Sequence, residues 1–526
     1  MPSLYKFNLW KLLAFSIADL LTMVGTHVKI IKNFWEEITM KKLLALCLCV
    51  MLLIGLVACA PTGDSTDAGE NTTAAANNAD QVQVGYGKVM VTPDESVPLR
   101  GYGYTEKRMS TGKWSELYLI AIAVTDTEGN TCIVISTDNC STPREVYTSA
   151  STKISKECGI PAENIIVTAI HQHSCPDLHQ DKVASAQKYR EGVFIPGLVE
   201  VAKQAMDNRA PATVQIQSIE TENMNFVRRY LTKDGDYHGT DTYVTEEGYY
   251  IEQETPVDNV MQVIKFVRKG QTTADGKEAK DIILVNFQGH PLMGTNGADT
   301  NVHADVPGVL REHLEKELDC NAIYITGASG NVEFKTRLKE LNKSKDYKDH
   351  AKMLANLIIK ADDKYTDVEL GAVKAAKTTY VGTCDHSRDG ELIKAKEAME
   401  HWEKYGDKQA LKEKFGYSQW LEPNAIINKS RLGETISFDI FTLSIGDIAF
   451  VGAPYEMFDT NGMEIKEGSP FDMTIVCTSA NGGNGYIPTA LGYSHGCYET
   501  NSTQFVSGTG DELRDEYLKL LNGLHG

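Results

Sequence analysis

From Val84 onward, short apolar runs alternate with longer segments in which apolar residues recur every three or four positions. Short runs rich in β-branched residues are typical of buried strands, and the longer period is typical of amphipathic helices. We predict strands at 117–124, 132–136, 165–169, 260–267, 282–287, 322–325, 436–443 and 448–452. We predict helices at 144–157, 193–206, 306–317, 347–362, 392–405 and 511–521. Strands that alternate with helices indicate an α/β fold, with a mixed sheet or sheets covered by helices.

Two polar stretches interrupt this alternation, and we interpret both as insertions. Residues 232–254 are rich in Gly and Tyr, and residues 385–431 are charged with a helical period. The sequence has no internal repeat and no second linker after residue 82. We therefore assign residues 83–526 to one domain.

The segment 40–58 has the composition of a secretory signal peptide. It begins Met-Lys-Lys, continues as an uncharged apolar run and ends Leu-Val-Ala directly before Cys59. This ending resembles a bacterial lipobox, which implies that Cys59 is lipidated and becomes the mature N-terminus. The alternative is a transmembrane helix, which would need a longer apolar run of about 20 residues. We predict an extracytoplasmic protein that is lipid-anchored to the bacterial cell membrane.

The residues on either side of this signal lack the features of a folded body. Residues 59–82 are rich in Ala, Asn, Thr, Asp and Gly, and we interpret them as a flexible tether. Residues 1–39 place two glutamates shortly before Met40, which is unusual ahead of a signal peptide. We interpret 1–39 as a mis-annotated upstream extension and Met40 as the true start.

Charge and cysteine content exclude several kinds of partner and site. The sequence has 71 acidic residues against 52 lysines and arginines, a formal net charge of −19. Such a chain repels phosphate backbones and anionic membrane surfaces, so we expect no nucleic-acid partner. The eight cysteines after Cys59 have no CxxC spacing, which disfavours a zinc site built from cysteines. Their even number permits disulfides, but the sequence does not give the pairing.

Two predicted strands end in histidines. His171 and His173 follow the strand 165–169, and residues two apart on an extended segment share one face, so both rings can reach one metal ion. His290 follows the strand 282–287 and precedes a proline, which cannot continue a ladder. The alternatives are histidines satisfied in the core or exposed on loops. Ligands often bind at strand ends in α/β proteins, which favours a metal site.

Two further segments carry candidate oxygen ligands. Glu456 follows the strand 448–452 after Gly-Ala-Pro, although it could also be a first-turn residue stabilised by a helix dipole. Tyr486 lies in Asn-Gly-Tyr-Ile-Pro-Thr, which alone indicates nothing.

Taken in order, these segments resemble the neutral/alkaline, non-lysosomal ceramidase family. Its motifs His-X-His-Ser, Gly-His-Pro, Pro-X-Glu and Gly-Tyr-(Ile/Val)-X-Thr occur here in the same order. The segments 89–93 (Val-Met-Val-Thr-Pro), 99–103 (Leu-Arg-Gly-Tyr-Gly) and 303–308 (His-Ala-Asp-Val-Pro-Gly) also match. Tyr486 and Tyr498 are twelve residues apart, the separation of the family's ligand and substrate-binding tyrosines. The resemblance spans about residues 85–499.

The resemblance implies the fold of the family's catalytic domain and a bound Zn²⁺ that would polarise an amide carbonyl and acidify water. The metal ligands that it implies are His171, His290, Glu456 and Tyr486. The residues that it implies for contact with the substrate are His173, Arg228 and Tyr498.

The sequence departs from the family at the catalytic nucleophile. Where the family has Gly-Asp-Val-Ser-Pro, this chain has Gly330-Asn-Val-Glu333-Phe, so glutamate replaces the serine and asparagine the aspartate. We hypothesise that Glu333 acts as a general base towards water. The alternative is a structural Glu333 in a site that has drifted. The sequence also ends soon after Tyr498, so we expect no counterpart of the family's C-terminal immunoglobulin-like domain, and ceramide itself becomes a weaker expectation.

These observations leave two functions. The first is an extracytoplasmic zinc-dependent hydrolase of an amide bond, acting on a small-molecule or lipid N-acyl substrate. The second is a catalytically inactive, lipid-anchored binding protein that retains the ceramidase fold. A metal-free serine hydrolase is disfavoured because the sequence contains no Gly-X-Ser-X-Gly.

Overall fold

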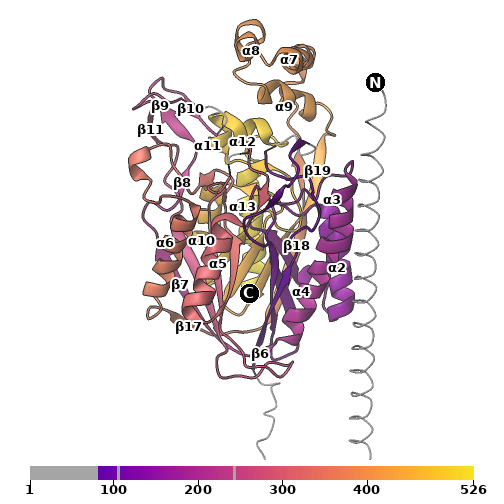
Figure 1. Ribbon diagram of the computed structural model, residues 1–526, viewed down its shortest axis with the longest axis vertical. Coiled ribbons are helices and arrows are strands. Elements are labelled where there is room, and N and C mark those ends of the chain that lie inside the picture. Colours follow the sequence, from indigo (N-terminus) through magenta and orange to yellow (C-terminus); the bar gives the residue numbers. More distant parts are fainter. Residues whose placement is uncertain (1–80, 103–106, 241–243, 296) are drawn as a thin grey trace, which may run out of the picture. The chain divides into compact units, whose positions relative to one another are not determined.

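The computed structural model describes residues 81–102, 107–240, 244–295 and 297–526 (Figure 1). All described residues belong to one compact unit. The predicted upstream extension, signal peptide, Cys59 and nearly all of the tether lie outside the described residues. No helix in the described ranges is long and apolar enough to cross a membrane.

Three mixed sheets form the body of this unit. The first has the strand order β5-β4-β3-β1-β6, the second β15-β13-β12-β7-β17 and the third β18-β19-β20-β22. Most pairs are antiparallel, but β4–β5, β13–β15 and β20–β22 are parallel. The first sheet comprises β1 (Gln83–Met90), β3 (Tyr118–Thr125), β4 (Thr131–Thr137), β5 (Ile165–Ala169) and β6 (Ala210–Pro211). The second comprises β7 (Thr213–Glu220), β12 (Val260–Val267), β13 (Ile282–Phe287), β15 (Asn321–Thr326) and β17 (Thr366–Val368). The third comprises β18 (Val373–Thr383), β19 (Thr435–Ile445), β20 (Ile448–Gly452) and β22 (Met473–Cys477).

The three sheets share one apolar centre. Ile122 of the first sheet, Leu284 of the second and Phe450 of the third belong to a single cluster of buried side chains. Strands that bury both faces read as continuous apolar runs, which is why β3, β4 and β13 are visible in the sequence. The free energy of burying this surface is what holds the three sheets against one another.

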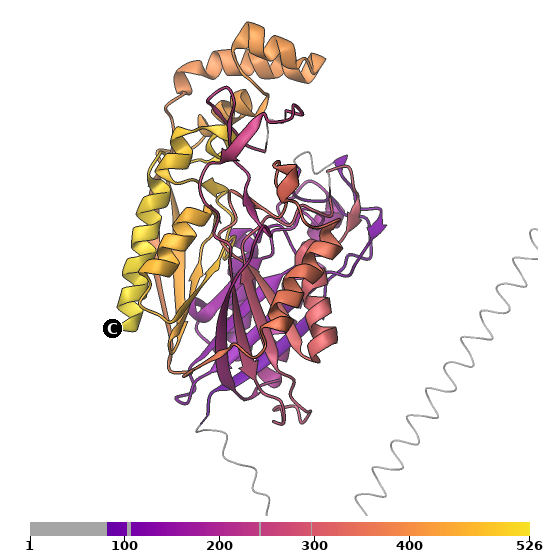
Figure 2. The same cartoon turned by 90° about the vertical axis from the view of Figure 1, so that its left-hand side faces the viewer.

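Helices cover the outer faces of the sheets (Figures 1 and 2). Helix α4 packs on β1 and β3, with α2 beside it. Helix α5 packs on β15 and on α6, and α13 packs on β18, β19 and α10. Their bounds are α2 (Arg144–Cys158), α3 (Ala184–Tyr189), α4 (Ile195–Asp207), α5 (Asp305–Leu318), α6 (Tyr347–Lys360), α10 (Asp459–Gly468) and α13 (Thr509–His525).

The two stretches interpreted as insertions both carry regular structure. The first forms a small sheet of β9 (Tyr230–Thr232), β10 (Tyr237–His238) and β11 (Tyr250–Gln253). The second forms α7 (Leu392–Tyr405), α8 (Lys408–Phe415) and α9 (Leu421–Lys429), which have an apolar cluster of their own. Helix α9 contacts α12 (Cys497–Ser502), which lies close to the candidate site.

The expectation of mixed sheets covered by helices is confirmed. All eight predicted strands and all six predicted helices are present, with ends displaced by at most a few residues. The prediction did not include β1, β7, β18 and β22. No disulfide joins any two of the eight cysteines that the structure describes.

Candidate metal centre

Short strands beyond the three sheets bring the candidate site residues together. They are β8 (Phe226–Val227), β16 (Val332–Glu333), β21 (Glu456–Met457) and β23 (Tyr486–Ile487). β16 pairs with β8, and β21 pairs with β23 so that Glu456 lies opposite Tyr486. Since β5, β13, β20 and β22 end nearby, segments distant in the sequence converge at this one edge.

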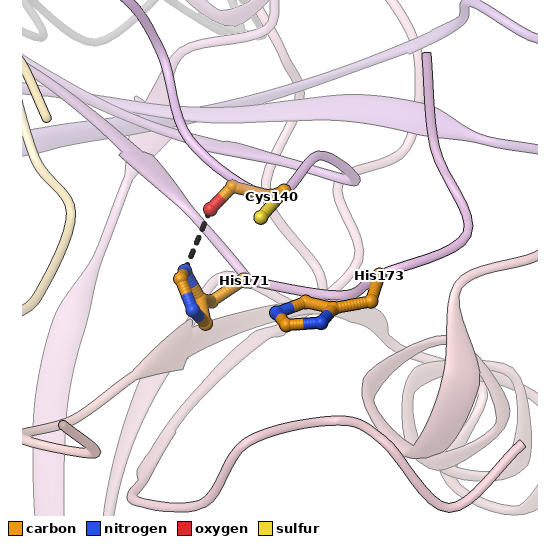
Figure 3. Close-up of side chains that lie close together, drawn as sticks. All are labelled: Cys140, His171 and His173. Atoms are coloured by element: carbon orange, nitrogen blue, oxygen red, sulfur yellow. Dashed lines mark hydrogen bonds between the residues drawn. The ribbon is translucent and has the colours of Figure 1, made fainter. Parts of the chain in front are cut away.

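His171 lies two residues beyond β5 and has a left-handed backbone, with φ of 65°. This conformation is unusual for a residue with a side chain and is found mainly where a function requires it. The His171 Nδ1–H donates to the carbonyl of Cys140 at 2.7 Å (Figure 3). His171 Nε2 therefore carries a lone pair.

His290 is fully buried beyond the end of β13. Its backbone N–H donates to the carbonyl of Val332, and its Nδ1–H donates to the carbonyl of Ser329 at 2.7 Å. Burial and the nearby Arg228 guanidinium lower the pKa of His290 to about 4. The ring is neutral at pH 7, and Nε2 again carries a lone pair.

Glu456 and Tyr486 complete the group. One carboxylate oxygen of Glu456, Oε2, lies 3.0 Å from His171 Nε2 and 3.2 Å from His290 Nε2. The Tyr486 hydroxyl lies 3.3 Å from His290 Nε2. Gly330 permits this packing, because a Cβ there would lie 2.6 Å from the carbonyl oxygen of Glu456.

This arrangement fits a metal cation. The charged Glu456 oxygen faces two imidazole lone pairs, and these atoms repel one another unless a cation lies between them. His171, His290 and Glu456 form a group whose ligand atoms lie within 4.8 Å of one another. Each imidazole donates its other N–H to a backbone carbonyl, as metal-bound histidines usually do. Two imidazoles, a carboxylate and a phenol suit zinc and several other divalent ions.

His173 lies beside the centre. Its ring centroid is 5.2 Å from that of His171 and 5.9 Å from that of His290. Both ring nitrogens are buried and lack a hydrogen-bond partner among the described residues. Burial together with His171 and His290 holds the pKa of His173 well below its usual range, so the ring is neutral. The backbone at Gly101, with φ of 121°, packs closely against the His173 ring, because glycine has no Cβ that would collide with His173.

Arg228 links the candidate ligands to the candidate base. Its guanidinium donates to the Tyr486 hydroxyl at 3.1 Å, to Glu333 at 3.4 Å and to Glu499 at 2.9 Å. Burial lowers the pKa of Arg228, but Tyr486, Glu499 and Glu333 outweigh it, so the guanidinium remains charged. Arg228 also lies over the ring of Tyr498, which packs edge-on against Tyr486.

Glu333 lies at the rim of the site. It is the bridge partner of His290 in a short parallel pairing, and its side chain is 23% exposed. Besides Arg228, its carboxylate accepts a long hydrogen bond of 3.5 Å from Thr240. Glu333 is therefore close to the centre, anchored on one side and accessible to solvent on the other.

A buried ionic network holds Arg228 in place. Glu499 is fully buried and accepts from Arg228 and, at 2.8 Å, from Arg229. Arg229 also pairs through two hydrogen bonds with Glu254, the residue directly after β11. The network therefore ties the small sheet of the first insertion to the candidate site.

Replacement of Glu499 by glutamine is expected to lower the free energy of unfolding by about 3–5 kcal/mol, because two buried arginines lose their shared counter-charge. Urea denaturation followed by circular dichroism measures this loss. The control is Glu516→Gln, which removes the partner of Lys519 on the surface and should cost less than about 1 kcal/mol. Equal midpoints for the two variants would contradict a stabilising role for Glu499.

Comparison with known proteins extends this picture. No protein-family model and no curated protein sequence matches the chain. Among solved structures, neutral ceramidase from Pseudomonas aeruginosa matches with a TM-score of 0.63 and 16% identity, over 85% of this chain and 74% of that chain. The chain has the neutral ceramidase fold. A structure described as ceramidase complexed with C2 matches with a TM-score of 0.61 and 16% identity, over 85% of this chain and 75% of that chain.

The likeness to neutral ceramidase confirms the fold that the ordered motifs implied. It does not assign roles to side chains, so the four ligands and the substrate contacts remain predictions that the geometry supports. The structure brings together all eight residues predicted for the site outside the lipidation position: His171, His173, Arg228, His290, Glu333, Glu456, Tyr486 and Tyr498.

The sequence did not reveal several residues that support the candidate site. Glu499 is adjacent to Tyr498 but lies in no recognisable motif. Asn331, noted only as a substitution, exchanges two hydrogen bonds with Asp459 at the start of α10. Cys140 contributes through its backbone carbonyl, for which the residue type gives no signal.

Proposed function

We propose that the protein is a zinc-dependent hydrolase of an amide bond, acting outside the cytoplasm on an N-acyl substrate. The observation that carries the proposal is the carboxylate oxygen of Glu456, which lies within 3.2 Å of two imidazole lone pairs. A buried cluster of this kind needs a cation, and its donors suit catalytic zinc. The solved neighbours are ceramidases, and their fold supports the choice of an amide bond.

His171, His290, Glu456 and Tyr486 would hold the ion. Zinc, when bound, polarises a carbonyl and lowers the pKa of water. The neutral His173 offers an imidazole nitrogen to the substrate on one side of the centre. The Arg228 guanidinium, which donates to the Tyr486 hydroxyl, would stabilise negative charge developing on the carbonyl oxygen.

Glu333 would act as the general base. Its carboxylate has one oxygen near Arg228, and its exposure leaves it accessible to water. It would accept a proton from the attacking water and return it to the leaving amine. With glutamate in place of the expected nucleophilic serine, hydrolysis would proceed by direct attack of water, without an acyl-enzyme.

The test combines metal analysis with turnover. Purified protein should contain one zinc per chain, and a panel of N-acyl amides with short, long and amino-acid acyl groups should reveal at least one released amine. The replacement of serine by Glu333 favours the second candidate, a non-catalytic binding protein. Stoichiometric zinc with tight binding but no released amine across the panel would favour that candidate.

Cys59 is proposed to carry the lipid anchor. The variant Cys59→Ala, expressed from the full-length sequence in a bacterium, should move the protein from the membrane fraction to the soluble or secreted fraction. Quantitative immunoblotting of the fractions measures the shift. Cys49→Ala, which changes a cysteine within the signal segment, is the control and should leave the protein with the membrane. Unchanged membrane association of Cys59→Ala would contradict the anchor.

A further inference from the structure

A second group of ligand atoms shares His171 with the group formed by His171, His290 and Glu456. The sulfur of Cys140 and ring nitrogens of His171 and His173 lie within 4.8 Å of one another, and all three residues are buried. The Cys140 side chain points into the space between the two rings (Figure 3). This group contains a thiol and no carboxylate, so its chemistry differs from that of the zinc-type centre.

His173 makes this group more than an isolated cysteine. Both of its ring nitrogens are buried without a hydrogen-bond partner among the described residues. A buried polar atom without a partner costs free energy, and a bound cation would remove that cost. Neither Cys140 nor His173 belongs to the group formed by His171, His290 and Glu456.

The donor set favours a soft cation of low coordination number. Structural zinc takes four ligands, whereas the described residues supply only three here. Thiolate and imidazole donors suit copper(I). Charge supports the same choice, because a thiolate and a monovalent cation leave no net charge in the buried site, whereas a divalent cation would leave an uncompensated positive charge.

We propose that Cys140 and His173, with His171 as the third ligand, form a copper(I) site that shares His171 with the zinc-type centre. The two ions would compete for Nε2, the one ring nitrogen of His171 that carries a lone pair. On binding, the thiol proton is released to solvent and a sulfur–copper bond forms, while copper remains monovalent. The bound ion occupies a nitrogen of His173 and engages the ring of His171. Copper(I) would therefore inhibit any reaction that needs His173 at the neighbouring centre.

Competition for copper(I) with the chromophoric chelator bicinchoninate, under ascorbate, tests the site in the full-length protein. Cys140→Ser should raise the dissociation constant of the proposed copper(I) site by about 100-fold or more, because the soft sulfur ligand is lost. The matched control is Cys477→Ser, since Cys477 is also fully buried and lies outside both groups of metal-ligating residues. Copper affinities of wild type and Cys140→Ser that agree within about threefold would overturn the proposal.

Differential alkylation identifies the ligand without any substitution. Wild-type protein with and without copper(I) is incubated with iodoacetamide at a urea concentration below the unfolding transition, and the rate at which each cysteine is alkylated is quantified by mass spectrometry. Copper should protect Cys140, while Cys477 should be alkylated equally in both samples. Equal alkylation of Cys140 would also overturn the proposal. His290→Ala should lose zinc but keep the copper-dependent protection, so a failure of the zinc site and a failure of the copper site give different results.

Discussion

Replacing His290 by alanine is expected to abolish zinc binding and to lower kcat/KM by about 10³-fold or more. His290 Nε2 contacts both oxygen donors, Glu456 at 3.2 Å and Tyr486 at 3.3 Å. Without it, the centre keeps one imidazole, and the charged carboxylate must be stabilised by solvent or by protonation. Zinc content per chain by mass spectrometry and kcat/KM on the best amide of the panel measure the two effects.

The control for this variant is His313→Ala. His313 lies on α5, where its ring contacts the Asn356 amide at the surface, far from the strand ends that form the site. The His313→Ala variant should bind one zinc per chain and retain wild-type turnover. If His290→Ala still bound stoichiometric zinc with unchanged affinity, the four proposed ligands would not be the metal site.

The second large effect is expected for Glu333→Gln, which should lower kcat by about 10²–10⁴-fold with zinc content unchanged. Glutamine has the shape of glutamate but cannot accept a proton from water. KM should change little if the carboxylate acts mainly in the transition state rather than in substrate binding. Steady-state kinetics over a range of amide concentrations separates kcat from KM.

Glu340→Gln is the matched control, because Glu340 lies nearby in the sequence, in the short 3₁₀ helix Lys339–Leu341, at an exposed position. It should retain full turnover. A wild-type kcat for Glu333→Gln would show that the carboxylate is not the base. Lost turnover together with lost zinc would instead assign Glu333 a role in supporting the centre.

Sequence periodicity predicted the buried strands well because they are nearly pure apolar runs. β13 is buried at every position, and so its sequence Ile-Ile-Leu-Val-Asn-Phe is unmistakable. By contrast, β18 contains lysines and threonines because most of its positions are partly or fully exposed, and the pattern resembled a loop. β7 is similarly mixed, with four of its eight positions neither buried nor apolar enough to mark a strand.

The candidate site was accessible from sequence only in part. His171, His290 and Glu456 each follow a predicted strand, and together with Tyr486 their order matched a known set of motifs. Glu499 could not be found, because its role depends on two arginines some 270 positions earlier that reach it only in three dimensions. The carbonyls of Cys140 and Ser329 were equally hidden, since a backbone oxygen is present at every position.

The four proposed ligands follow strands of three different sheets. They can therefore surround one metal ion only when all three sheets are folded and packed together. A fragment that contains only one sheet supplies at most two of the ligands, so it should hold the ion weakly. An ion that binds only the finished body stabilises it against global unfolding in proportion to the logarithm of its free concentration. A low concentration of free zinc would then lower the stability of the whole protein against unfolding, in addition to removing the activity of the metal site.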